Sequence, residues 1–191
     1  MEAFRNVLAN STLTVVRLTH CERTHQLLGI GLGEHRWHAL HSDRVRPEWL
    51  DQQAFSTQLL GLSETALKMT AAYLRERQQF GVPIGTFQAV SQRVGDAFIA
   101  LETMRVSLWR AAWLESEGRS SAFAVASARY LATKGAHQIV SAAQHLHGGM
   151  GFDRDYPLHR YFLGVKRIEY LEGGASAQLQ RLGDLIAERQ P

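Results

Sequence analysis

Residues Arg75–Gln88 (RERQQFGVPIGTFQ) lie between two long segments in which apolar residues recur every three or four positions. That spacing predicts one amphipathic helix over about 48–78 and another over about 86–117. Gly81 has a flexible backbone and Pro83 lacks a backbone N–H group. Both features end a helix and allow a tight turn. The stretch therefore predicts two antiparallel helices of a bundle.

The helical periodicity continues to the C-terminus. A third helix is expected from Ser120, as its N-cap, to about Leu146, and a short fourth helix with Pro157 in its first turn. A last helix is expected over about 175–187. The alanines of the third helix indicate close approach to its neighbours, and the predicted stripe of the second includes Phe98.

The first 47 residues differ from the rest, being irregular and rich in histidine. Leu13–Leu18 is rich in β-branched residues and favours a β-strand. We therefore expect an all-α fold, an antiparallel up-down helical bundle over 48–191. A short non-helical or β segment over 1–47 precedes it.

Composition narrows the class of protein. The 191 residues are 45% hydrophobic, which suits one main domain with a real core. A net charge of +3, mixed along the chain, does not favour nucleic-acid binding. The single Cys21 excludes an internal disulfide and fits a reducing cytosol. Without a signal peptide at Met1–Asn10 or a long apolar run, we expect a cytoplasmic protein with no membrane segment.

Two motifs invite a functional interpretation beside a structural one. Arg77 near a helix C-terminus complements the helix dipole, and Phe80 could cap the core; alternatively, Arg77 binds a phosphate and Phe80 offers a flat apolar surface to a ring. His147–Gly151 (HGGMG) is either a tight corner between helices or a place where the backbone approaches a ligand.

Carboxylates and histidines give two further candidates. Glu172, before the last helix, is either a helix cap or a general base in an apolar pocket. His35, His38 and His41, together with Glu22–His25, suggest a metal site. A di-iron bundle needs two carboxylate–histidine motifs on facing helices, which the helical part lacks, so we expect no metal.

Two stretches together resemble one known family. Tyr73–Ala97 (YLRERQQFGVPIGTFQAVSQRVGDA) and Gln144–Lys166 (QHLHGGMGFDRDYPLHRYFLGVK) are similar to the C-terminal helical domain of acyl-CoA dehydrogenases. The similarity covers about 50–189, and HGGMG is most like actinobacterial-type members. It implies α,β-dehydrogenation of an acyl-CoA in fatty acid or steroid catabolism, with FAD as the cofactor. It also implies a homo- or hetero-oligomer, a dimer or tetramer, with FAD at a subunit interface.

The resemblance also implies which residues contact FAD. Arg77, Gln79 and Phe80 would contact the diphosphate and ring system, with Gln88 close by. Gly148 and Gly149 would receive the adenosine end, and His145, just before them, is a further cofactor-binding candidate. The family often has glutamine at the place of His145; here a glutamine stands one position earlier.

The base of the reaction has two candidates under this resemblance. The family's Glu-Gly-Thr is replaced by Glu172-Gly-Gly-Ala-Ser; counting forward from Pro157 gives Glu172, while counting back from Gln178–Arg181 gives Gly174. A minority of the family carries the base on the first helix, about 30 residues before the glycine of the Arg-x-x-Phe-Gly motif, a position that Asp51 occupies.

Family members usually carry two further domains before this one, and residues 1–47 resemble at most a remnant of the middle β-domain. We therefore expect either an acyl-CoA dehydrogenase subunit or truncated enzyme, or a non-catalytic assembly partner of a full-length subunit.

Overall fold

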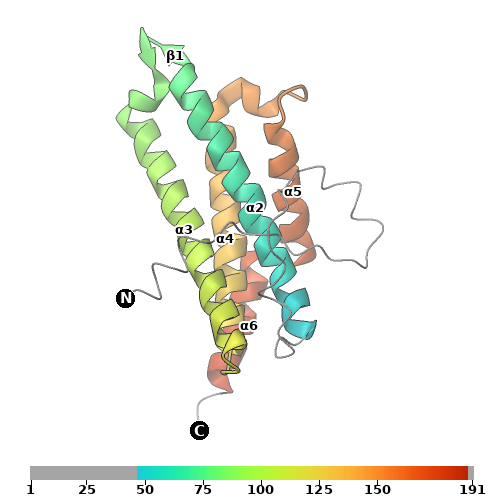
Figure 1. Cartoon of the computed structure of the whole chain (residues 1–191). Coiled ribbons are helices and arrows are strands. Elements are labelled where there is room, and N and C mark those ends of the chain that lie inside the picture. Colours follow the sequence, from blue (N-terminus) through green and yellow to red (C-terminus); the bar gives the residue numbers. More distant parts are fainter. Residues whose placement is uncertain (1–46, 189–191) are drawn as a thin grey trace, which may run out of the picture. The chain divides into compact units, whose positions relative to one another are not determined.

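The computed structural model describes residues 47–188, with side chains from Gln53 onward. This part is a bundle of long helices that run up and down beside one another (Figure 1). Its elements are α2 (Pro47–Glu76), β1 (Gln78–Gln79), β2 (Val82–Pro83), η2 (Ile84–Thr86), α3 (Gln88–Ser116), α4 (Ala122–His147), η3 (Gly148–Phe152), α5 (Leu158–Leu171) and α6 (Gly174–Ala187). The expected all-α bundle is confirmed. The predicted strand and the histidine cluster of the N-terminal segment lie outside the described residues.

Helix α4 is the centre of the bundle, because it packs against α2, α3, α5 and α6. Its inward positions are small: Ala128, Ala132 and Ala136 are completely buried. Small side chains let helix axes approach closely, and the larger Leu59, Met104 and Val165 of the neighbouring helices fill the remaining space. The prediction that the alanines mark close packing is confirmed.

The register predicted for α3 is wrong in part. The side chain of Phe98 was expected in the core but is 55% exposed. The buried face is formed by Ala97, Leu101, Met104 and Ala111. The apolar residues of α3 occur on two faces, so periodicity alone does not identify the inward one.

The start of α4 also differs from the expectation. The residue before the helix is Ser121, not Ser120, and its side chain makes no capping hydrogen bond to the backbone. The Ser121 hydroxyl instead donates to the buried carboxylate of Glu115, at the end of α3. The turn is therefore held by a side-chain contact between two helices.

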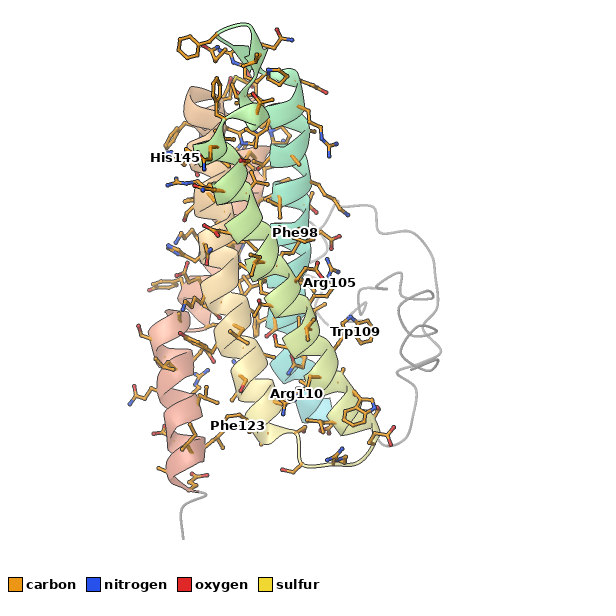
Figure 2. All side chains as sticks on the ribbon, turned by 90° about the vertical axis from the view of Figure 1, so that its left-hand side faces the viewer. Phe98, Arg105, Trp109, Arg110, Phe123 and His145 are labelled. Carbon is orange, nitrogen blue, oxygen red and sulfur yellow. The ribbon has the colours of Figure 1, made fainter. Side chains whose placement is uncertain are left out.

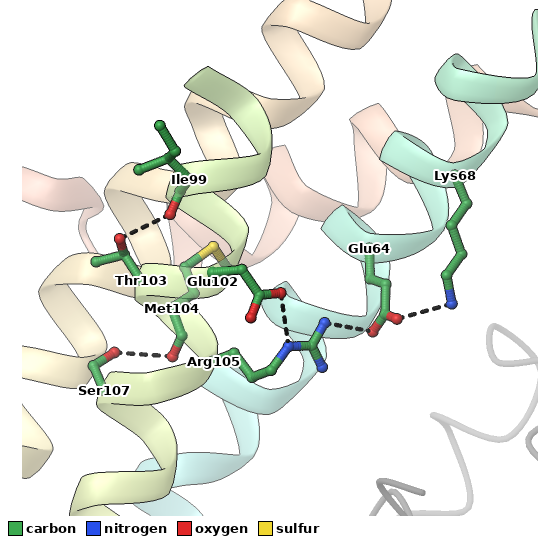
Figure 3. A network of polar contacts seen from close by, with 8 residues as sticks. All are labelled: Glu64, Lys68, Ile99, Glu102, Thr103, Met104, Arg105 and Ser107. Carbon is green, nitrogen blue, oxygen red and sulfur yellow. Dashed lines mark hydrogen bonds and ion pairs between the residues drawn. The ribbon is translucent and has the colours of Figure 1, made fainter. Parts of the chain in front are cut away.

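A chain of ionic contacts joins α2 to α3 on one side of the bundle (Figure 3). The Arg105 guanidinium lies 3.1 Å from Glu102 and 3.4 Å from Glu64, which lies 2.8 Å from Lys68. Burial alone would raise the pKa of Glu64, but the hydrogen bond from Lys68 and the charge of Arg105 hold that pKa below its usual range. Since these groups are partly exposed, each pair contributes at most about 1 kcal/mol.

Two absences apply to the described residues. No helix among them is long and apolar enough to cross a membrane. Within the same range, no group of three or more His, Cys, Asp or Glu side chains is placed to hold a metal ion.

Candidate functional site

The two segments predicted to contact a cofactor lie at the same end of the bundle. The connection from α2 to α3 carries Arg77–Gln88, and α4 ends there with the glycine-rich η3 (Figure 1). Helix α2 runs towards this end, α3 runs back, and α4 returns to it. The alternation of helix directions thus brings together motifs that are separated by more than one whole helix in the sequence.

The connection after α2, predicted as a turn, is a short β-hairpin with a two-residue loop. Gln78 pairs with Pro83 and Gln79 with Val82, leaving Phe80 and Gly81 at the tip. Both tip residues have positive φ, 54° for Phe80 and 78° for Gly81. Positive φ at both central positions is the geometry of a type I′ turn, which glycine adopts readily and phenylalanine does not.

Phe80 points into solvent. Its side chain is 93% exposed, so the prediction that it could cap the core is wrong. Its one described ring partner is Phe87, edge-on at 6.3 Å between centroids and itself 36% exposed. An exposed aromatic ring held in a backbone conformation that costs about 1–3 kcal/mol is typical of ligand-binding sites.

The polar residues of this connection are exposed as well. Arg77 lies directly after α2, and its side chain, like those of Gln79 and Gln88, is exposed. The Arg77 carbonyl accepts the Ile84 amide at 2.8 Å, which closes the base of the hairpin. The guanidinium is therefore displayed from a fixed backbone.

The glycine-rich segment begins at the end of α4. Gly148 has a φ of 57° and stops the helix, a conformation that disfavours any side chain. Gly149 is exposed beside it, and His145 is exposed on the last turn of α4 (Figure 2). At Gly151 an added Cβ would lie 2.8 Å from the Gln144 carbonyl oxygen. The loop is therefore tightly folded, with its first two glycines open to solvent.

Three rings connect the two segments through contacts that the sequence does not predict. His147 stacks on Tyr73 of α2, with centroids 4.4 Å apart and planes at 21°. Its Nε2 lies 3.1 Å from the Tyr156 hydroxyl, which belongs to the connection between η3 and α5. The sequence shows a histidine directly before the glycine that ends α4. Its main ring partner, Tyr73, lies too far away along the chain for the contact to be inferred.

Glu172 lies between α5 and α6, in polar surroundings rather than the expected apolar pocket. Its carboxylate is 9% exposed and forms an ion pair with Arg129 of α4. The Gln178 amide donates to the Glu172 carbonyl at 2.6 Å and to its carboxylate at 3.4 Å. Glu172 is the C-cap of α5, and Gly173 is the N-cap of α6, so the prediction that Glu172 caps the N-terminus of the last helix is wrong.

The other proposed base is less well defined. Asp51 lies in the first turns of α2, and its side chain is outside the described residues. Of the two candidate bases, the structure therefore gives side-chain contacts only for Glu172.

The hairpin and glycine loop form an outward-facing surface. Two shallow cavities of about 280 and 340 Å³ were found along α4, and none of the predicted cofactor residues lines either one. An arginine fork, amides and an exposed ring suit an anionic ligand with a flat ring system, such as FAD. A buried cofactor site needs a concave surface, so this one requires a second surface to cover the ligand.

Comparisons with known proteins identify the family of this domain. The family model for the acyl-CoA dehydrogenase C-terminal domain matches residues 50–187. Acyl-CoA dehydrogenase FadE27 of Mycobacterium tuberculosis is 42% identical over 137 residues, which cover 68% of this chain and 37% of FadE27. This chain thus spans little more than a third of that relative.

Solved structures share the fold. The Tcur3481-Tcur3483 steroid acyl-CoA dehydrogenase variant superposes with a TM-score of 0.70 at 48% identity, covering 74% of this chain and 39% of that one. The ChsE4-ChsE5 complex of Mycobacterium tuberculosis gives 0.71 at 41% identity, covering 75% and 39%. The FAD complex of PigA gives 0.68 at 28% identity, covering 74% and 37%. The chain belongs to the acyl-CoA dehydrogenase family, and residues 50–187 form its C-terminal domain.

Proposed function

We propose that this chain supplies the helical, FAD-contacting part of an acyl-CoA dehydrogenase that introduces an α,β double bond into an acyl-CoA thioester. The observation that carries the proposal is the hairpin tip: Phe80 is fully displayed in a strained backbone conformation, three residues after the exposed Arg77. Such a residue does not stabilise a packed core, but it can contact a ligand or a second subunit.

The residues fit FAD in their chemistry. Arg77 would bind the diphosphate, Gln79 and Gln88 would donate to polar groups of the cofactor, and Phe80 would pack against its ring system. Gly148 and Gly149 would let the backbone approach the adenosine end. When bound, FAD supplies the acceptor for the hydride that leaves the β-carbon of the acyl-CoA.

We expect Arg77→Ala and Phe80→Gly both to weaken FAD binding, measured by titrating FAD into the protein, with any copurifying subunits, and following flavin fluorescence. Loss of a charge-assisted hydrogen bond costs about 1.5–3 kcal/mol, so Arg77→Ala should weaken binding by roughly 10- to 100-fold. Phe80→Gly removes the ring and relieves the positive-φ strain, so binding falls while thermal stability stays equal or rises.

Arg167→Ala is the matched control for charge, because Arg167 is exposed on α5 away from the hairpin. It should leave FAD binding unchanged. Absence of any flavin binding by the wild-type protein, with or without other subunits, would contradict the proposal. Equal weakening by Arg167→Ala would show that only overall charge matters.

The position of Glu172 favours a second function, that of a non-catalytic partner subunit. We infer that a carboxylate held by Arg129 and Gln178 must break its ion pair before it can accept a proton from substrate. This favours a partner subunit that shapes the site while another subunit supplies the base. If this chain supplies the base itself, Glu172 and Asp51 remain the two candidates.

The outer face of α3 is the surface we propose for a second acyl-CoA dehydrogenase subunit. This outer face consists of Phe98, Ile99, Val106, Trp109 and Trp113, which are 42–65% exposed. At 3.6 residues per turn these five lie within an arc of about 100°, opposite the buried face of the same helix. Figure 2 shows Phe98 and Trp109 along this helix. Glu102 lies within the same arc and is paired with Arg105. A helix whose outer side is otherwise apolar is expected to be buried on that side as well.

Trp109→Glu should dissociate the assembly. A buried interface tryptophan typically contributes at least about 2 kcal/mol, so the subunit dissociation constant should rise about 30-fold or more. Sedimentation velocity over a concentration series measures it. Leu163→Glu places the same charge on an exposed leucine of α5 and should leave the assembly intact. A wild-type protein that stays monomeric at all concentrations, also with acyl-CoA dehydrogenase subunits added, contradicts this surface.

A further inference from the structure

His147 is enclosed at the end of α4 although it directly precedes the exposed glycine loop. Its side chain is 2% exposed, and Nδ1 lies 2.8 Å from the Ala143 carbonyl oxygen. A carbonyl only accepts, so Nδ1 carries the proton and donates it. In the neutral ring Nε2 is then the acceptor, and the Tyr156 hydroxyl donates to it over 3.1 Å. Both ring nitrogens are thus satisfied in one tautomer.

The ring also holds two other parts of the chain. Tyr73, on which it stacks, lies on the last turns of α2, four residues before Arg77. The Arg77 amide donates to the Tyr73 carbonyl at 2.8 Å, so the backbone of the hairpin starts from the residue that His147 contacts. On the other side, the peptide from His147 leads directly into Gly148. One imidazole therefore contacts the starting points of both candidate FAD-contacting segments.

We propose that His147 is a positioning residue that couples the hairpin of Arg77–Gly81 to the Gly148–Gly149 loop, so that the two segments are held in register for one ligand. The link to FAD rests on the function proposed above, but the coupling itself concerns only this chain. His147 does not contact the ligand; it acts through Tyr73 and through the start of the loop.

Protonation of the ring is expected to release this coupling. Burial lowers the pKa of His147, despite the opposing hydrogen bond to Ala143. Among the described residues, the titratable groups in contact with the ring are Tyr73 of α2 and Tyr156 of the following connection, and the charge of Glu76 acts on Tyr156. Burial first, then Tyr73 and Glu76, raise the pKa of Tyr156, so this phenol stays neutral across the relevant range. Protonation turns Nε2 into a donor, which the Tyr156 hydroxyl must rotate to accept.

The sign of the pH effect follows from the lowered pKa. The unfolded chain has an ordinary histidine pKa of about 6.5 and takes up a proton before the folded one does. The contribution of neutral His147 is therefore complete above about pH 6.5 and is lost as the pH falls towards the lower folded-state pKa. Acid, not alkali, should loosen the two segments.

Amide hydrogen exchange on the full chain without FAD tests the coupling. His147→Phe keeps a ring but loses both hydrogen bonds that fix its orientation against Tyr73, and Tyr73→Leu removes the stack but leaves the hydrogen bonds. We expect Tyr73→Leu to speed exchange in Gly148–Phe152, and His147→Phe to speed exchange in the hairpin Gln78–Pro83, each at least fivefold. Between pH 7 and 5, corrected for intrinsic rates, hairpin exchange should rise in the wild type and stay flat in His147→Phe.

His137→Phe makes the same substitution at a half-exposed position of the same helix and should leave both segments unchanged. If His147→Phe does not fold by circular dichroism, Tyr156→Phe removes only the hydroxyl and takes its place. The proposal would be overturned if Tyr73→Leu sped exchange only in the hairpin and His147→Phe only in Gly148–Phe152. Each residue would then support its neighbouring segment without coupling the two.

Titration with FAD separates this proposal from the proposed function. If FAD binds, His147→Phe should weaken it about tenfold at pH 7.5, and the pH dependence of binding below pH 6.5 should disappear. If the wild type binds no FAD while the exchange effects occur, the proposed function fails and the coupling stands. If FAD binds equally to both proteins and exchange does not cross between segments, the coupling fails and the function stands.

Discussion

Glu172→Gln should destabilise the bundle by about 3 kcal/mol whether or not Glu172 takes part in catalysis. The substitution removes the counter-charge of Arg129, whose side chain is only 19% exposed. Removing one partner of a buried ion pair typically costs about 3–5 kcal/mol, and we use the lower end because Arg129 keeps some contact with water. For a domain of this size the melting temperature should fall by roughly 10 °C, measured by circular dichroism at 222 nm.

Glu169→Gln is the matched control, because it makes the same change three residues earlier on α5. Glu169 is 22% exposed and paired with Lys166 and His137, so the loss should stay below about 1 kcal/mol. The double substitution Glu172→Leu with Arg129→Met removes both charges and should recover most of the stability. A Glu172→Gln protein that melts within a degree of the wild type would contradict a structural role for the ion pair.

This result affects how activity measurements are interpreted. A loss of turnover in Glu172→Gln would ordinarily identify the catalytic base, yet here the same change also breaks the ion pair with Arg129, while the bond from Gln178 to the backbone carbonyl of residue 172 remains. Turnover must therefore be compared at a temperature where both proteins are folded. Loss of activity in a fully folded Glu172→Gln protein would favour Glu172 as the base. Retained activity that Asp51→Asn abolishes would favour Asp51, and activity retained in both variants would favour the partner-subunit function.

The bundle could be predicted from the sequence because its signals are local. Gly81 and Pro83 mark the connection between α2 and α3, and the small residues of α4 identify it as the helix that others approach. The register of α3 could not be predicted in the same way. Phe98 and Met104 lie on different faces of one helix, and only the packed structure shows that the face with Met104 points inward.

The candidate site was predictable only in its exposed residues. The chemistry of Arg77 and the glycines can be recognised from their types and order along the chain. The contact of Tyr73 with His147, and that of Glu172 with Arg129 across 43 positions, depend on how the helices pack. Likewise, the positive φ of Phe80 results from the two-residue hairpin, which its flanking Gln-Gln and Val-Pro do not announce as a strand pair.

Gly135→Leu should destabilise the bundle at least as much as Glu172→Gln, because Gly135 lies where α4 crosses α3. An added Cβ would lie 2.7 Å from the Met104 sulfur and 2.9 Å from its Cγ, inside the limit for non-bonded contact. Met104 is completely buried and has little room to move away. Overpacking of a core costs about 1–3 kcal/mol, and a leucine at a position too small for a methyl group should reach the upper end. Urea unfolding measures the change.

The smaller substitution gives the sharper test, because its sign depends on the site. Gly61→Ala, in α2, meets nothing within 4 Å and should stabilise the helix by up to about 1 kcal/mol. Gly135→Ala gains the same helix propensity but forces Met104 to shift, so we expect a net loss of stability. Met104→Ala in the Gly135→Ala background should then cost less than Met104→Ala alone, since the new methyl occupies the vacated space. If Gly135→Ala stabilises the protein as Gly61→Ala does, the two helices are not packed as closely as the structure places them.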